Sequence, residues 1–228
     1  MNIYKSIYYQ FRFNGLKQTS RLMCLDCQDF IRKGAKVIDL GCGSGIIGQT
    51  LSTTFDATVI GADVRDDRVV DLPFQVVDGG ILPFKENEFD VCLISYVLHH
   101  TENPLFLLQE AKRICKGKII IYEDLPEGLL PRSRCHVHLL FSSFLTGVFR
   151  QRFNFKTQQE WERLFEDLGF WIFAKKRVYK NNDWIDPVKR VLYVLEKIQT
   201  NQSNTSVKYD FSLELAESNI KEEIPVYV

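Results

Sequence analysis

Short apolar runs alternate with stretches of helical periodicity along the first half of the chain. The runs at 36–40, 58–63, 75–77 and 90–95 are bounded by glycine, proline or charged residues, as buried strands are. Between the first two runs, residues 46–54 carry apolar side chains at helical spacing. Such alternation predicts a parallel sheet with helices on both faces.

The pattern continues in the second half, where the last two strands are joined without a helix. Asn103 and Pro104 supply a cap and a first-turn proline for one helix, and a strand follows at 119–122. A capping box at 157–160 begins another helix. The apolar runs at 171–179 and 190–196 then predict a closing hairpin. The expected fold class is α/β, with a seven-stranded, mostly parallel sheet and an antiparallel last strand.

Three segments lie outside this alternation and suggest the domain boundaries. Residues 1–34 are expected to form a helical cap, with Gly15 separating two helices. The domain proper is predicted to span 35–197, and to carry a strongly apolar insertion at 125–156. Residues 198–228 begin with a polar, linker-like stretch and are predicted to be a tail.

A glycine-rich turn follows the first strand and is the main candidate for a ligand site. Asp39 precedes three glycines spaced two apart, and an apolar helix start follows them. Glycine tolerates positive φ and lets a ligand approach the backbone closely. The unpaired amides at the helix start attract anionic or electron-rich groups. Residues 43–48 also fit the dinucleotide pattern G-x-G-x-x-G, so an NAD-type oxidoreductase is an alternative.

Four motifs in order resemble the class I S-adenosylmethionine (SAM) methyltransferases. Residues 39–45, with their acid and three glycines, resemble motif I of that family, and 58–63 resemble its second strand with a terminal acid. Residues 75–84 and 89–100 resemble the third- and fourth-strand motifs. The resemblance implies a Rossmann-like fold and SAM as cofactor. It also implies the closing hairpin, which the NAD alternative does not predict.

The segment between the second and third strands departs from the family outline. Residues 64–74 are too short for a full crossover helix and are expected to hold a turn of helix at most.

The resemblance also implies roles for single residues. The glycine turn would lie against the methionine end of SAM, with Asp39 holding its amino group or ordering the loop. Asp63 would accept hydrogen bonds from the ribose hydroxyls, and Asp78 would meet the adenine amino group. The predicted cofactor-binding residues are Asp39, Gly41, Cys42, Gly43, Gly45, Asp63, Val64, Asp78, Gly79 and Ser95.

Composition narrows the classes of partner. The chain has 228 residues, of which 45% are hydrophobic and 25% charged, as in an ordinary soluble domain. The formal net charge of +0 leads us to expect no nucleic-acid partner. No apolar run is long enough to span a bilayer, and the N-terminus lacks a signal peptide's apolar core. We therefore expect no transmembrane segment and a cytoplasmic location.

The six cysteines are scattered, and we predict no metal site. Cys24 and Cys27 form a C-x-x-C without a second pair, which favours two small apolar side chains on one helix face.

The acceptor site is expected at the carboxyl ends of the fourth and fifth strands. The titratable or polar candidates there are Ser95, Tyr96, His99, His100, Glu123 and Asp124. Among them His100 is the first candidate for a general base and His99 the second, and these two with Tyr96 are the predicted catalytic residues. An oxygen acceptor usually needs such a base, and a carbon acid always does.

Residues 125–156 are predicted to form a cap over the acceptor, with Phe144 lining an apolar pocket. Neutral charge and an apolar insertion favour a small, partly apolar metabolite or lipid-like acceptor. The alternatives are a protein acceptor and a catalytically silent member that binds SAM and a partner. The methylated atom and the oligomeric state stay open.

Overall fold

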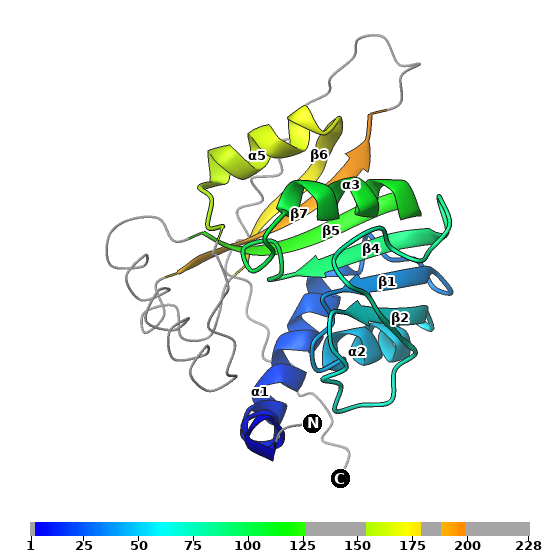
Figure 1. The fold of residues 1–228 in the computed structure, drawn as a ribbon, viewed down its shortest axis with the longest axis vertical. Helices are drawn as coiled ribbons and strands as arrows, with labels where there is room; N and C mark the ends of the chain where they lie inside the picture. The colour runs from blue at the N-terminus through cyan, green and yellow to red at the C-terminus, as the bar shows by residue number, and fades with distance from the viewer. Residues whose placement is uncertain (1–2, 126–153, 179–187, 199–228) are drawn as a thin grey trace, which may run out of the picture.

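Seven strands of the described chain form one mixed sheet in the order β3-β2-β1-β4-β5-β7-β6 (Figure 1). The structure is a computed structural model and describes residues 3–125, 154–178 and 188–198. The strands are β1 (Lys36–Leu40), β2 (Thr58–Asp63), β3 (Phe74–Val76), β4 (Phe89–Ser95), β5 (Cys115–Leu125), β6 (Phe170–Val178) and β7 (Lys189–Lys197). β1 to β5 run parallel, and β7 pairs antiparallel with both β5 and β6. The predicted sheet with its antiparallel last strand is confirmed.

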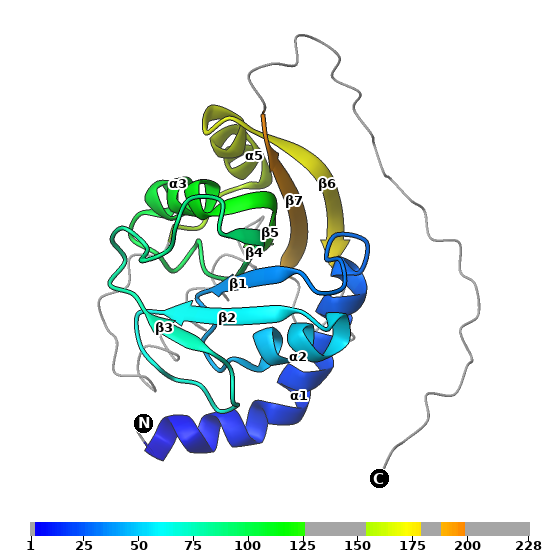
Figure 2. The same cartoon turned by 90° about the vertical axis from the view of Figure 1, so that its right-hand side faces the viewer.

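Helices cover both faces of the sheet, as predicted. They are α1 (Ile3–Cys27), α2 (Ile46–Phe55), α3 (Pro104–Ile114) and α5 (Gln158–Asp167). Figures 1 and 2 show α3 and α5 on one face and α1 and α2 on the other. Side chains alternate along the strands, so Ile119 and Ile121 of β5 join the α3/α5 core. Ile120 and Tyr122 join the α1/α2 core.

The N-terminal segment differs from the prediction, because α1 is one continuous helix that runs through Gly15. A lone glycine in a helix costs only about 1 kcal/mol relative to alanine, so packing can override it. Packing is strong in the second half of α1, where Met23, Cys24 and Cys27 are buried in the α1/α2 core. Both cysteines of the C-x-x-C thus lie on the buried helix face, as expected, and the Cys27 thiol lies 3.1 Å from the Tyr122 hydroxyl.

β5 begins earlier than predicted, at Cys115 directly after α3. The register against β4 is irregular there, since Phe89 pairs with Cys115 but Val91 pairs with Lys118. A Cβ at Gly117 would overlap the carbonyl oxygen of Asp90, so the two backbones touch at this point. The glycine is therefore part of the strand rather than of a turn before it.

The short segment between β2 and β3 contains no helix among its described residues. Its Leu72 is buried with Met23, Leu51 and Val59, so the segment and α1 together fill the α1/α2 core. This agrees with the expectation of no full crossover helix there.

The carboxyl ends of β1, β2, β4 and β5 meet at one edge of the sheet, because these strands are parallel and adjacent. Ligands bind beyond this edge in open α/β sheets. None of the helices that the structure describes has the length and apolar character needed to cross a bilayer.

Candidate functional site

The glycine turn lies between β1 and α2. Gly41, Gly43 and Gly45 all have positive φ, at 76°, 49° and 76°. A Cβ at Gly41 would overlap the γ-methyl groups of Val97, which follows β4. At Gly43 an added Cβ would meet nothing within 4 Å. Gly41 is thus required for packing, whereas Gly43 leaves the backbone open to a ligand.

Asp63 joins the end of β2 to this turn. Its Oδ2 accepts a hydrogen bond of 2.9 Å from the Gly43 N–H, and its Oδ1 accepts one of 2.7 Å from the Val64 N–H. Each carboxylate oxygen keeps acceptor capacity for a further donor. Val64 beside it is 58% exposed, so a hydrogen-bond acceptor, the Asp63 carboxylate, and an apolar side chain lie next to each other at the sheet edge.

Asp39 lies deeper than expected of a residue that contacts a ligand. It is 1% exposed, and its Oδ2 has no hydrogen-bond partner among the described residues. Burial and then the charge of Asp63 raise the pKa of Asp39 to about 7, although a hydrogen bond from the Gly48 backbone lowers it. The position on the α2 side of β1 fits a role in ordering the turn.

We expect Asp39→Asn to stabilise the cofactor-free protein more at pH 8 than at pH 4.5. In the folded chain this carboxyl keeps its proton up to about pH 7, while the unfolded chain releases it near 3.8. The native state therefore binds more protons between these values, and the free energy of unfolding falls as the pH rises through them. Asparagine removes that loss, so we expect the gain to be about 3 kcal/mol larger at pH 8 than at pH 4.5. Denaturant unfolding at both pH values tests this, and an equal difference at both would contradict it.

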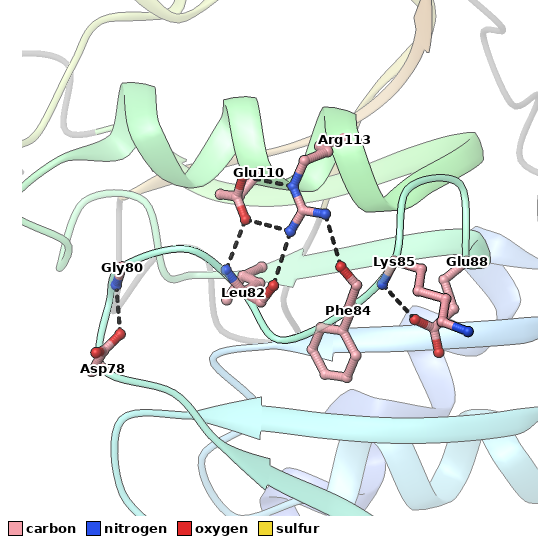
Figure 3. Close-up of polar contacts among 8 residues, drawn as sticks. All are labelled: Asp78, Gly80, Leu82, Phe84, Lys85, Glu88, Glu110 and Arg113. Carbon is pink, nitrogen blue, oxygen red and sulfur yellow. Dashed lines mark hydrogen bonds and ion pairs between the residues drawn. The ribbon is translucent and has the colours of Figure 1, made fainter.

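The loop after β3 carries the second group of predicted ligand residues. Asp78 is exposed, and its Oδ1 accepts a hydrogen bond of 2.8 Å from the Gly80 N–H (Figure 3). Gly79 has a φ of 82°. Ile81, which the sequence analysis did not single out, is 77% exposed. Its place directly after Asp78, Gly79 and Gly80 was the sequence signal that could have marked it.

Cys42 and Ser95 differ in which of their groups lie at the edge where a ligand would bind. The Cys42 side chain is buried against Gly61 of β2, so only its backbone faces the turn. Ser95 ends β4, and its buried Oγ has no partner among the described residues. Ser95 is therefore a polar group available at the carboxyl edge.

A buried histidine–glutamate pair lies at the carboxyl ends of β4 and β5. His99 Nδ1 is 2.6 Å from Glu123 Oε2, and the two residues are 4% and 0% exposed. Glu123 Oε1 also accepts a hydrogen bond of 2.8 Å from the Leu98 N–H. Burial lowers the pKa of His99, but the hydrogen bond and charge of Glu123 raise it more, so its pKa lies above the ordinary value. Such a pair fixes the tautomer of the imidazole and increases its basicity.

The other two predicted catalytic residues lie close to this pair but on different sides. The His100 ring centroid is 4.1 Å from that of His99. Tyr96 packs instead with the α1/α2 core, and its φ of 57° is unusual for an aromatic residue. Arg190 of β7 lies over the Tyr96 ring at 5.7 Å. Burial raises the pKa of Tyr96, so this side chain can donate a hydrogen bond but is a poor base.

Only the two ends of the predicted acceptor cap are among the described residues. Its first residue, Leu125, ends β5. At its other end the Asn154 N–H donates to the His99 carbonyl at 2.9 Å, and the Phe155 ring stacks on the His99 imidazole at 5.0 Å. Both ends therefore reach the carboxyl edge beside the histidine–glutamate pair. The predicted pocket residue Phe144 lies outside the described residues.

A family model described as a methyltransferase domain matches residues 16–175. The chain is 28% identical over 155 residues to an uncharacterised protein of Methanocaldococcus jannaschii, covering 67% of this chain and 73% of that protein. It is 27% identical over 168 residues to the demethylmenaquinone methyltransferase of Staphylococcus aureus, covering 61% and 69%.

Solved structures share the fold. A chain from the complex of the Haloferax volcanii Trm112 methyltransferase activator with a methyltransferase aligns with a TM-score of 0.65 and 16% identity, over 87% of this chain and 99% of that one. The magnesium protoporphyrin IX methyltransferase of Synechocystis, solved with S-adenosylhomocysteine, aligns with a TM-score of 0.59 and 19% identity, over 81% and 84%.

Proposed function

Because this chain belongs to the class I SAM-dependent methyltransferases, we propose that it transfers the SAM methyl group to a small, partly apolar acceptor. The observation that carries the acceptor class is the His99–Glu123 pair with Phe155 stacked on it. A base beside an aromatic side chain suits a small molecule with an acidic proton on an apolar body. The Staphylococcus aureus and Synechocystis proteins are also named for small-molecule acceptors.

The residues at the glycine turn fit the cofactor. Gly43 leaves room for a ligand to approach the backbone, and Asp63 keeps acceptor capacity for the ribose hydroxyls. The exposed Val64 and Ile81 are apolar side chains suited to the two faces of an adenine ring, and Asp78 suits its amino group. The buried Oγ of Ser95 is suited to the polar methionine end.

SAM supplies an electrophilic methyl group on a sulfonium. The chain's task is to hold an acceptor atom in line with that group and to remove the acceptor's proton. We assign the proton transfer to His99, since Glu123 holds its Nδ1 and leaves Nε2 as the basic nitrogen. Tyr96 packs with the α1/α2 core, so it is a candidate for supporting the acceptor site rather than for contacting the acceptor. His100, whose ring lies 4.1 Å from that of His99, is the candidate for positioning the acceptor.

The cap over the acceptor is assigned to residues 125–156. Its two described ends support this, because Leu125 and Asn154 both lie at the carboxyl edge. The sequence between them is rich in leucine and phenylalanine, which suits an apolar acceptor.

Calorimetric titration and a turnover screen test the function. SAM and S-adenosylhomocysteine should bind, and NAD should bind far more weakly. Purified protein with SAM should then methylate members of a panel of phenols, quinols and carboxylic acids. Methylation of proteins in an extract but of no small molecule would favour the protein-acceptor alternative. SAM binding without methylation of any class of acceptor would favour the alternative that the chain is a catalytically silent member of the family.

We expect Asp63→Ala to weaken SAM binding by about 1–3 kcal/mol, because it removes the acceptor for the ribose hydroxyls. It also frees the Gly43 and Val64 amides that the carboxylate holds. Asp78→Ala should cost less, since a backbone amide near Gly79 can still hold the adenine. Asp71→Ala removes an exposed carboxylate from the segment between β2 and β3 and is the control. Dissociation constants that do not change in either test variant would contradict this placement of the nucleoside.

A further inference from the structure

An ion pair on α3 holds the backbone of the loop that follows β3. Arg113 donates to both carboxylate oxygens of Glu110, at 2.9 and 2.7 Å (Figure 3). The hydrogen bonds of Arg113 lower the pKa of Glu110, so the pair is charged. Glu110 accepts from the Leu82 N–H at 2.7 Å, and Arg113 donates to the carbonyls of Leu82 and Phe84 at 2.9 and 2.8 Å. The N–H and the carbonyl of Leu82 are thus both held by one pair of side chains.

This arrangement fixes the direction of Ile81. On one side Asp78 accepts from the Gly80 N–H, and on the other the pair binds both backbone groups of Leu82. The Leu82 side chain is 3% exposed in the α3/α5 core, whereas Ile81 is 77% exposed. Ile81 is therefore presented to solvent by a backbone that is bound on both sides of it.

α3 has stabilising contacts other than the Glu110–Arg113 pair. α3 buries Leu108, Ala111 and Ile114 in the core, and the Asn103 side chain caps its first turn. Glu110 is nonetheless a carboxylate with only 7% exposure. Buried ion pairs seldom add net stability over apolar residues, and where they are useful it is often because they specify one arrangement.

We propose that Glu110 and Arg113 are positioning residues for the cofactor, which set SAM affinity by holding Ile81 against the adenine ring. This inference rests on the proposed placement of the nucleoside. It means that two residues of α3, which do not contact SAM themselves, set its affinity through the loop that follows β3.

A double-mutant cycle tests the proposal. SAM dissociation constants are measured calorimetrically for the full chain and for Arg113→Lys, Ile81→Ala and the double variant. Lysine keeps the charge but cannot bind two carbonyls and a carboxylate at once, so we expect binding about tenfold weaker. If Arg113 acts through Ile81, adding Arg113→Lys to Ile81→Ala should change affinity less than about twofold.

Glu110→Gln and Glu196→Gln complete the design. Glu110→Gln breaks the same ion pair and should weaken binding in the same direction, which gives a second reading if Arg113→Lys folds poorly. Glu196 pairs with Lys118 at 2.7 Å near the amino end of β5, so Glu196→Gln removes a comparable ion pair far from the loop and should leave affinity unchanged. Wild-type affinity in Arg113→Lys and Glu110→Gln, or fully additive losses in the cycle, would overturn the inference alone. No SAM binding by the wild-type chain would overturn the proposed function with it.

Discussion

Replacing Glu123 by glutamine is expected to slow methyl transfer about 100-fold or more and to move the acid limb of the pH–rate profile to lower pH. Glutamine can still accept the Leu98 N–H hydrogen bond, but it removes the charge that raises the pKa of His99. His99 is a base only when neutral, so in the wild type the rate rises as the pH passes through the raised pKa. In the variant His99 loses its proton at lower pH and is a weaker base.

Initial rates against pH, with an acceptor from the screen, measure this effect, and NMR titration of the His99 imidazole measures it without any acceptor. Glu88→Gln is the matched control, because Glu88 also accepts from a backbone N–H, at Lys85, and pairs with a cation, Lys36. It lies near the amino ends of the strands, so its removal should leave the profile unchanged. If Glu123→Gln keeps the wild-type acid limb but has a lower melting temperature, the His99–Glu123 pair only supports the fold.

Gly41→Ala is expected to reduce the free energy of unfolding by about 2–4 kcal/mol, through backbone strain and overpacking together. Gly41 has a φ of 76°, and an added methyl group would overlap Val97. Because Val97 leads into the turn that carries His99, a displaced Val97 should also reduce turnover. Denaturant unfolding measures the loss of stability.

Two further variants separate strain from overlap. Adding Val97→Ala to Gly41→Ala removes the overlapping methyl groups and should recover part of the loss, but not the part due to positive φ. Gly43→Ala has positive φ but open space, so it should cost only about 1 kcal/mol of stability while blocking the approach of SAM. Equal losses of stability at the two glycines would show that contact with Val97 does not matter.

Much of the fold could be predicted because its elements have local causes. β1 and β2 have the predicted bounds, since each is a short apolar run that ends at a turn. The Thr157–Glu160 capping box starts α5 as expected, with both of its hydrogen bonds present. Two differences from the predictions involve glycines, the unbroken helix α1 and the early start of β5 at Cys115. Gly15 lies inside a helix and Gly117 inside a strand, because tertiary packing decides at both places.

The candidate site was predicted less completely, because its pairings depend on strand register. Glu123 and His99 are 24 residues apart, and only the alignment of β4 with β5 brings them together. From the sequence alone, nothing distinguished the two adjacent histidines by their partners, and the base among them stays a prediction. Glu110 and Arg113 are three apart on one helix, so their mutual contact was predictable. Their hydrogen bonds to the Leu82 backbone were not predictable, because these depend on where the loop after β3 lies.

The place of β7 between β5 and β6 also orders events during synthesis. β6 is made before β7, and among the described strands its partner is β7, so this pairing cannot form until Lys189–Lys197 has left the ribosome. Until then β5 presents an unpaired edge along residues 119–125, which later pair with β7. Unpaired edges of this kind favour association with other chains. We therefore expect the nascent domain to be prone to association until β7 is inserted between β5 and β6.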